Sequence, residues 1–149
     1  MPRYIVDASV AAKWYFQEEH TELAETLFEE DRHLLAPDFL HVEVAAIVWK
    51  RIRKAEADPV AAGEILAELS QTPIDFESAP VLVPDALALA LRTGRTIYDC
   101  LYLALAVREG CPLVTADRRF YNSLQSGPLS QHLLWIGDLV DPMAVIRHE

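Results

Sequence analysis

Two acidic residues stand apart from the other acids of this chain because their surroundings are apolar. The sequence contains 23 Asp and Glu residues, and most of them lie in polar clusters such as residues 17–20 and 29–33. Glu43 instead lies within an apolar run, residues 39–49, and an alanine and an isoleucine follow it at the i+3 and i+4 positions. Asp99 has a tyrosine and a leucine at the same spacing. Because these positions share one face of a helix, we expect both carboxylates to point inward.

A buried carboxylate needs compensation, and this need indicates the chemistry. Burying a lone carboxylate costs several kcal/mol unless a cation or hydrogen bonds offset the loss of water, and a bound metal ion supplies such a charge. Two further acids, Asp7 and Asp117, directly follow short apolar runs. A set of carboxylates without a His or Cys pair at ligand spacing suits Mg²⁺ or Mn²⁺ better than zinc. The sequence therefore predicts a hard-cation site formed by Asp7, Glu43, Asp99 and Asp117.

Each of these acids also has a purely structural interpretation. Asp7, Asp99 and Asp117 precede or begin predicted helices, where an aspartate commonly caps the first turn. The same capping role is predicted for Asp38, Asp58 and Asp85. Glu43 is not explained as a cap, because Asp38 is predicted to hold that role in the same helix, but it could pair with an arginine from elsewhere in the chain.

Strands and helices alternate along the chain, which predicts an α/β fold. Apolar runs predict strands over residues 3–6, 34–36, 74–76, 111–115 and 133–136. Amphipathic spacing and capping signals predict helices over residues 8–16, 21–30, 37–49, 58–70, 84–92 and 97–107. This order favours a parallel sheet with helices on both faces, and such sheets bind ligands beyond the carboxyl ends of their strands. Asp7 and Asp117 are expected at that edge.

The composition limits the classes of function. At 149 residues, 52% of them hydrophobic, the chain is predicted to form one domain over residues 1–149. The net charge of −10 argues against a broad electrostatic grip on nucleic acid, so any contact with phosphate must be local. The candidates for such contacts are Lys50, Arg51, Arg118 and Arg119, which are equally well explained as solvated helix ends.

Neither a membrane anchor nor a disulfide is predicted. No apolar run approaches the ~20 residues of a membrane-spanning helix, and an acid interrupts the N-terminal run too early for a signal peptide. Cys100 and Cys111 lack the C-x-x-C spacing of a redox or zinc site, so we expect two reduced, buried cysteines. The predicted location is cytoplasmic.

Four segments, taken in order, resemble the PIN domains and, within them, the VapC-type ribonuclease toxins of toxin–antitoxin pairs. They are residues 5–9, Glu43 in a helix after Ala36-Pro37, residues 98–106 and residues 113–120. The resemblance runs almost from end to end. It implies a three-layer α/β/α fold with a central parallel sheet that gathers the four acids. One departure is Ala46, where many relatives place an asparagine one turn after the glutamate.

The resemblance also implies an activity and partners. The expected activity is that of a Mg²⁺- or Mn²⁺-dependent endoribonuclease that hydrolyses RNA and leaves 5′-phosphate and 3′-hydroxyl ends. Ser9 and Thr115 would supply hydroxyls that support the metal ligands or position the substrate. A cognate VapB-type antitoxin would cover the site, and a homodimer would form on helical surface, with Leu66 and residues 14–16 among the apolar candidates.

Two other classes of function fit parts of the pattern. A regulatory receiver-like domain would use Asp7 as phospho-acceptor. Such a domain predicts an early pair of acids, a central acceptor aspartate and a late lysine at a strand end, and none of these is apparent. A non-catalytic interaction module would bind a partner through its apolar helices and use the acids structurally. The absence of any metal-induced thermal shift would favour the interaction module.

Overall fold

The sheet at the centre of the molecule has five parallel strands. The structure, a computed structural model, describes residues 1–29 and 31–139. The strands are β1 (Arg3–Val6), β2 (His33–Pro37), β3 (Ile74–Glu77), β4 (Leu113–Thr115) and β5 (Leu133–Trp135). Their order in the sheet is β3-β2-β1-β4-β5, and every neighbouring pair is parallel. The predicted parallel α/β sheet is confirmed, with β1 at its centre.

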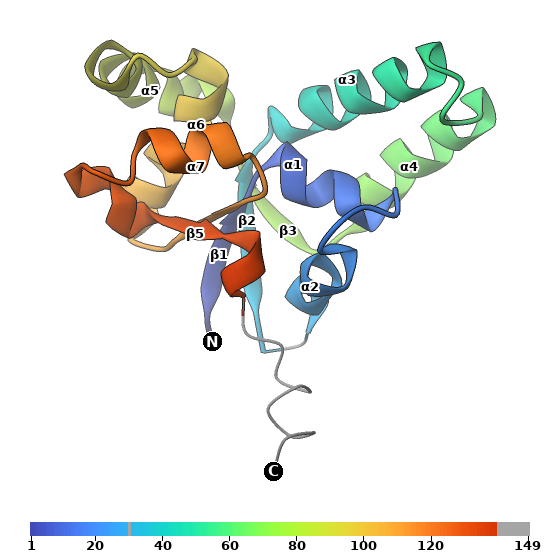
Figure 1. The fold of residues 1–149 in the computed structure, drawn as a ribbon, viewed down its shortest axis with the longest axis horizontal. Helices are drawn as coiled ribbons and strands as arrows, with labels where there is room; N and C mark the ends of the chain where they lie inside the picture. Colours follow the sequence, from blue (N-terminus) through green and yellow to red (C-terminus); the bar gives the residue numbers. More distant parts are fainter. Residues whose placement is uncertain (30, 140–149) are drawn as a thin grey trace.

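Helices cover both faces of this sheet, as parallel connections require. The α-helices are α1 (Ala8–Ala11), α2 (Thr21–Glu25), α3 (Leu40–Arg53), α4 (Pro59–Gln71), α5 (Ala79–Thr93), α6 (Ile97–Glu109) and α7 (Arg118–Ser123). Short 3₁₀ turns are η1 (Ala12–Trp14), η2 (Thr26–Phe28), η3 (Pro128–His132) and η4 (Ile136–Asp138). Figure 1 shows α1 to α4 on one side of the sheet and α5 and α6 on the other. The fold is therefore the expected three-layer α/β/α arrangement.

Helix α6 is the main covering element on its side of the sheet. It packs across β1, β2 and β4, and α5 packs on its outer surface. Every residue from Cys100 to Ala106 is buried, which explains why α6 is apolar on nearly all sides. Both cysteines are free and buried, as predicted.

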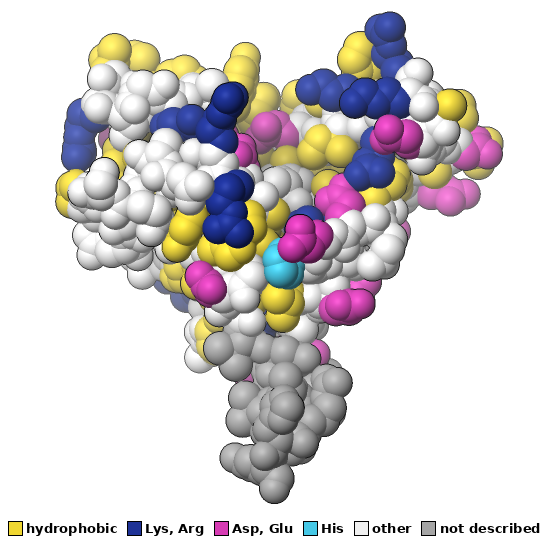
Figure 2. Space-filling view, in the orientation of Figure 1, with side chains coloured by type: hydrophobic (Ala, Val, Ile, Leu, Met, Phe, Trp, Pro, Cys, Tyr) yellow, Lys and Arg dark blue, Asp and Glu magenta, His cyan; other side chains and the backbone are white. Residues whose placement is uncertain are grey.

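The helix pairs α3–α4 and α5–α6 diverge beyond the carboxyl ends of the strands (Figure 1). In the space-filling view a notch separates the two pairs, and acidic side chains lie within it (Figure 2). Asp7 follows β1 and Glu43 lies in the first turn of α3, so both are carried to this end of the sheet. The divergence leaves the acidic edge open.

The structure corrects the predicted start of the fifth helix. The sequence pattern placed it at Pro84-Asp85, whereas α5 begins at Ala79 and contains Pro84. A proline inside a helix removes one backbone hydrogen bond, but Leu82, Ala86 and Leu89 are buried, and this packing offsets the loss. Asp85 is consequently an exposed helix residue and not a cap.

The predicted caps at Asp38 and Asp58 have different outcomes. Asp58 caps α4 as expected, because its side chain accepts a hydrogen bond from the amide of Val60. The N-terminal residue bordering α3 is Phe39, and Asp38 Oδ1 instead accepts the amide of Ala79 at 2.9 Å. Asp38 therefore stabilises the start of α5, a helix distant in sequence.

Several apolar residues singled out for a partner surface pack against the body of the protein. Trp14, Tyr15 and Phe16 are half-buried against the hydrophobic core, and Leu66 is also half-buried. Among the exposed large apolar side chains, α5 carries more than any other element. Within the described ranges, no helix has the length and hydropathy needed to cross a membrane.

Candidate active site

The acid at the end of the central strand is the most deeply enclosed of the four. Asp7 directly follows β1 and retains only 7% of its surface exposed. Its Oδ1 accepts hydrogen bonds from Ser9 Oγ at 2.5 Å and from the Val10 amide at 3.1 Å, and its Oδ2 accepts one from Thr115 Oγ1 at 2.6 Å. Burial raises the pKa of Asp7 to about 6, although these three hydrogen bonds oppose the rise. The side chain is thus fixed in place and carries an unfavourable buried charge at neutral pH.

Ser9 and Thr115 connect the ends of β1 and β4. Besides donating to Asp7, Ser9 Oγ accepts the amide of Ala116 at 2.9 Å. Thr115 Oγ1 accepts the amide of Asp117 at 3.1 Å in addition to its own donation to Asp7. The two hydroxyls therefore hold Asp7 and the backbone that leads to Asp117 in one rigid arrangement.

Asp117 follows β4 and caps α7. Its Oδ1 accepts the amide of Phe120 at 3.1 Å, and Asp7 caps α1 through Val10 in the same manner. The capping interpretation of these two acids is therefore confirmed. Capping uses only one carboxylate oxygen of each residue, so it does not exclude a second role.

Glu43 lies in the first turn of α3 and is half-buried. Burial raises the pKa of its carboxyl group, the nearby Tyr102 phenol opposes the rise, and the charge of Asp99 adds to it. Ion pairing with an arginine was the structural alternative for Glu43, but no Lys or Arg within the described ranges forms a salt bridge with it. Its negative charge is left without a cationic partner there.

Asp99 lies in the first turn of α6, where Thr96 and not Asp99 caps the helix. Arg95 Nη2 donates to Asp99 Oδ2 at 2.9 Å. Burial raises the pKa of Asp99, Arg95 opposes that rise, and the charge of Asp117 adds to it. Asp99 is thus the one acid of the four with a neighbouring cation among the described residues.

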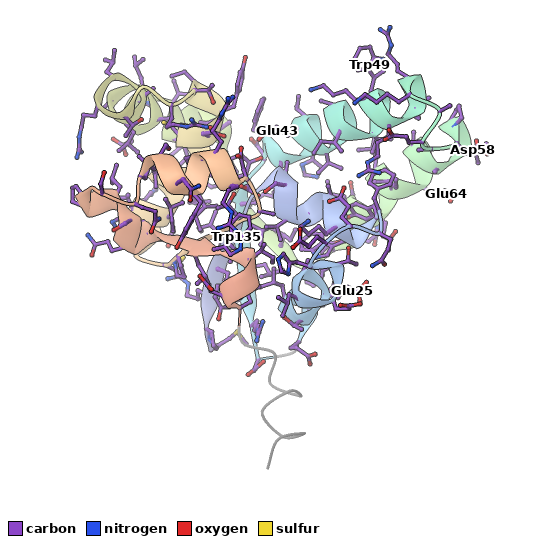
Figure 3. All side chains as sticks on the ribbon, viewed as in Figure 1. Glu25, Glu43, Trp49, Asp58, Glu64 and Trp135 are labelled. Atoms are coloured by element: carbon purple, nitrogen blue, oxygen red, sulfur yellow. The ribbon has the colours of Figure 1, made fainter. Side chains whose placement is uncertain are left out.

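All four predicted acids line one small pocket at the carboxyl ends of β1 and β4. Its lining residues are Asp7, Ala8, Ser9, Glu43, Ile47, Asp99, Tyr102 and Asp117. The charges of Glu43, Asp99 and Asp117 raise the pKa values of Asp7, Glu43 and Asp99 respectively, which means that the acids repel one another. In the side-chain view Glu43 points into the space between the diverging helix pairs (Figure 3).

The acids share this pocket without converging fully. In residues 1–29 and 31–139, no three side chains of His, Cys, Asp or Glu lie close enough together to hold a metal ion as they stand. Ile47, and not Ala46, lines the pocket one turn after Glu43, and Ala46 is exposed. The position where relatives place an asparagine therefore contributes no polar group here.

Tyr102 is a site residue that the sequence pattern did not identify. In the sequence Tyr102 stands out only as an apolar neighbour of Asp99. In the structure it lines the pocket, and only 2% of its surface is exposed. Its hydroxyl lies beside Glu43, but no atom of the described chain completes a hydrogen bond of ordinary geometry with it. Burial and the nearby carboxylates raise its pKa well above the ordinary range. The phenol therefore remains protonated and has a hydrogen to donate into the pocket.

The four cations considered for phosphate contacts have different environments. Arg51 pairs with Glu18 and lies 4.3 Å from the centre of the Phe16 ring, so it is already engaged. Lys50 and Arg119 are exposed. Arg118, next to Asp117, lies over the ring of Trp135 at 3.7 Å.

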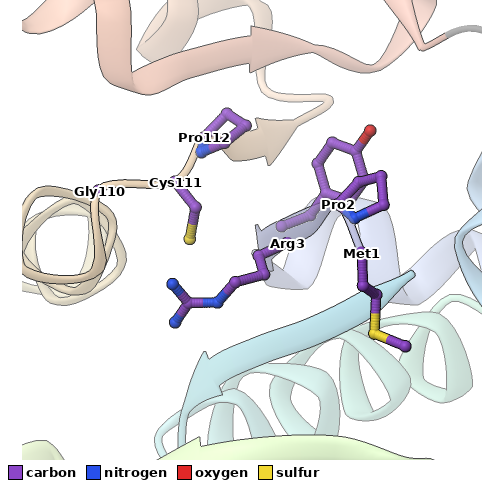
Figure 4. Close-up of a pocket in the computed structure, with 7 residues that line it drawn as sticks. Met1, Pro2, Arg3, Gly110, Cys111 and Pro112 are labelled. Carbon is purple, nitrogen blue, oxygen red and sulfur yellow. The ribbon is translucent and has the colours of Figure 1, made fainter. Parts of the chain in front are cut away.

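A larger hollow at the opposite end of the sheet lacks comparable chemistry. It is lined by Met1, Pro2, Arg3, Tyr4, Gly110, Cys111 and Pro112, which surround the start of β1 (Figure 4). The guanidinium of Arg3 is paired with Glu109 at 2.7 Å. The acidic pocket is accordingly the candidate active site.

Two comparisons with known proteins find matches over most of the chain. Residues 4–123 match the model of the PIN domain family. The chain is 36% identical over 119 residues to Ribonuclease VapC3 of Pyrobaculum aerophilum, an alignment that covers 78% of this chain and 91% of that protein.

Solved structures share the fold at lower sequence identity. PAE2754 from Pyrobaculum aerophilum superimposes with a TM-score of 0.66 at 21% identity, covering 98% of this chain and 88% of that one. VapC20 of Mycobacterium tuberculosis, a toxin that cleaves the sarcin-ricin loop, gives 0.64 at 16% identity and coverage of 81% and 95%. A toxin–antitoxin complex from Klebsiella pneumoniae gives 0.57 at 9% identity, with coverage of 88% and 95%.

Proposed function

The chain belongs to the PIN domain family, and we propose that it is a ribonuclease toxin that cleaves RNA phosphodiester bonds in the cytoplasm. We take residues 1–149 as one PIN domain. The activity is supported by the 36% identity to a protein named as a ribonuclease. The single observation that carries the proposal is that Asp7, Glu43, Asp99 and Asp117, which come from separate segments of the chain, line one pocket.

The residues of the pocket fit a divalent cation such as Mg²⁺ or Mn²⁺. All four acids offer hard oxygen donors, and among the described residues neither His nor Cys lines the pocket. Burial and repulsion from neighbouring acids disfavour the charged forms of Asp7, Glu43 and Asp99, and a cation would relieve both effects. Since the acids do not converge as they stand, binding requires side-chain movement. Asp7 is held by hydrogen bonds, so Glu43 and Asp99 are the candidates to move.

The bound cation would lower the pKa of a water molecule and would stabilise negative charge on the phosphate. The chain's own residues have separate tasks. Ser9 and Thr115 orient both oxygens of Asp7. The protonated phenol of Tyr102 can donate a hydrogen bond to Glu43 and hold its carboxylate toward the pocket. Arg95 neutralises Asp99 in the metal-free protein.

The proposed partners are an antitoxin and a second copy of the chain. A VapB-type antitoxin is supported by the fold shared with a toxin–antitoxin complex, and the notch above the acids offers a place for a covering segment. For the homodimer we propose the outer face of α5. Val83, Leu87 and Leu91 recur there every four residues and are 43%, 50% and 81% exposed.

The proposed function is tested by incubating purified, antitoxin-free protein with a pool of tRNA and rRNA, with and without Mg²⁺ or Mn²⁺. Wild-type protein is expected to cut RNA only when a divalent cation is present. The substitution Asp117→Asn is expected to lower the rate of cleavage by at least about a hundredfold. Asp85→Asn changes an exposed aspartate of α5 and should cut at the wild-type rate. Absence of cutting under every condition, together with no thermal shift on adding metal, would favour an interaction module instead.

A further inference from the structure

An aromatic and basic cluster lies beside the acidic pocket and has no task in the proposed hydrolysis. The guanidinium carbon of Arg118 is 3.7 Å from the centre of the Trp135 ring. The rings of Tyr121 and His20 lie 5.8 Å and 6.4 Å from that of Trp135, centre to centre. We call these four residues the Trp135 platform. Trp135 is labelled near the middle of the face shown in Figure 3, and Figure 2 shows basic side chains and a histidine next to hydrophobic atoms on that face.

The platform adjoins the acidic pocket through two backbone connections. Trp135 ends β5 and is the register partner of Thr115, whose hydroxyl donates to Asp7. Neighbouring strands lie ~4.8 Å apart, so the two residues are side by side. Arg118 follows Asp117 directly as the first residue of α7. A ligand that spans the platform and the pocket therefore needs to be no longer than a few nucleotides.

The indole of Trp135 is held over the backbone that follows it. A Cβ atom at Gly137 would lie 2.8 Å from Trp135 Nε1, so any residue other than glycine would push the indole away. The His20 ring meets the indole edge-on. The ring is therefore held in place by the backbone at Gly137 and by His20, while part of its surface remains exposed.

Arg118 is a cation without an acidic partner in the described part of the chain. No carboxylate there lies within ion-pair distance of it, although the sequence has 23 acids and only 13 Lys and Arg residues. Stacking on an indole leaves the N–H edge of a guanidinium and its second face free. An arginine presented in this way can bind a phosphate through its N–H groups and stack a base on its exposed face.

We propose that the Trp135 platform binds a nucleotide of single-stranded RNA next to the cleaved bond, with Arg118 on its phosphate and the aromatic surface against its base. The inference rests on the proposed ribonuclease function and names the residues that recognise its substrate. Single-stranded RNA fits because its bases are free to stack on aromatic side chains, whereas the bases of a duplex are not. A local contact of this kind also suits a chain with a net charge of −10.

The test measures binding of a short single-stranded oligoribonucleotide in an Asp7→Asn background, where cleavage does not interfere, and cleavage kinetics in the otherwise unchanged protein. Arg118→Gln is expected to raise the Kd about tenfold, and to raise KM by a similar factor while kcat changes less. Arg118→Lys, which keeps the charge without the planar fork, should fall between Arg118→Gln and the unchanged protein. The matched control is Arg108→Gln, an exposed arginine at the opposite end of α6 from Asp99.

Trp135→Leu provides a second variant, and its melting temperature shows whether the fold survives. A Kd raised by Arg118→Gln and Trp135→Leu but not by Arg108→Gln supports the platform. If Trp135→Leu does not fold, Arg118→Gln alone decides. An unchanged Kd for Arg118→Gln would overturn the proposal and leave the cluster as a surface for a protein partner. If the wild-type chain does not cleave RNA, the proposed function is refuted. The oligonucleotide-binding measurements then still test the Trp135 platform separately.

Discussion

At the residue scale, Asp7 combines a structural role with an electrostatic cost. It caps α1 and accepts hydrogen bonds from two hydroxyls, yet burial still disfavours its charge. Residues that the fold alone required would not be expected to carry such a penalty. The penalty is understandable if the carboxylate is retained to bind a cation.

Replacing Asp7 by asparagine should stabilise the metal-free protein at neutral pH. Folding raises the pKa of this carboxyl group from 3.8 to about 6. Ionisation of the group therefore lowers the free energy of unfolding. The folded state bears no such cost below pH 3.8, loses stability as pH rises from 3.8 through 6, and above that pH is less stable by roughly 3 kcal/mol. Melting curves without metal should therefore show Asp7→Asn above wild type at pH 7.5, with a smaller gap at pH 4.

The comparison needs a neutralised aspartate that lies outside the pocket. Asp85→Asn removes a charge from the exposed face of α5 and should leave the melting temperature within about 1 °C of wild type. If Asp7→Asn melts below wild type at pH 7.5, the charged carboxylate stabilises the fold. The predicted loss of stability from its buried charge would then be wrong.

At the element scale, the loop between α5 and α6 supplies the cation that the metal-free site contains. Arg95 lies just before α6 and pairs with Asp99 in the first turn of that helix. The Nε atom of Arg95 is buried without a hydrogen-bond partner in the described chain. An arginine held in this way occupies the charge position that a divalent cation would take over.

Arg95→Gln should lower the stability of the metal-free protein and increase its response to metal. Loss of the ion pair is expected to cost about 1 kcal/mol, because the pair is only partly shielded from water. Mg²⁺ would then no longer compete with the guanidinium, so the rise in melting temperature on adding Mg²⁺ should exceed that of wild type. Arg92→Gln, an exposed arginine of α5, serves as the control. A smaller rise in Arg95→Gln would contradict competition at Asp99.

The elements that position the site were largely predictable from local sequence patterns. Alternating strands and helices predicted the parallel sheet, and apolar surroundings singled out Glu43 and Asp99. The start of α5 was not predictable, because the packing of Leu82 and Ala86 overrides the proline signal. Asp38 was misassigned for a related reason, since its hydrogen-bond partner at Ala79 is distant in sequence. Tyr102 and Arg95 acquire their roles only through burial and pairing in three dimensions.

At the scale of the whole molecule, a net charge of −10 and an exposed apolar face set the conditions for association. Two copies of an acidic chain repel each other, and this repulsion opposes a broad interface between them. A small apolar contact is therefore favoured. We propose the exposed side chains of Val83, Leu87 and Leu91 on α5 as this contact. None of the three lines the acidic pocket, so the proposed dimer would not use the pocket residues themselves.

Leu87→Glu should convert the proposed dimer into monomers. A carboxylate at the middle of the α5 face would have to be buried against its own copy, which costs several kcal/mol. Light scattering after gel filtration should report the mass of one chain, 16.8 kDa, for this variant and twice that mass for wild type. Val42→Glu changes an exposed apolar residue of α3 and should remain dimeric. Monomeric wild-type protein would refute the α5 interface.

Titration with Mn²⁺ tests, without relying on catalysis, whether the four acids together bind a divalent cation. Electron paramagnetic resonance counts the free ion directly. Wild type and Asp85→Asn should bind Mn²⁺ equally, whereas Asp7→Asn, Glu43→Gln, Asp99→Asn and Asp117→Asn should each weaken binding by about tenfold or more. Equal Mn²⁺ binding by wild type and all four pocket variants, or no binding by wild type, would show that these acids do not form a cation site.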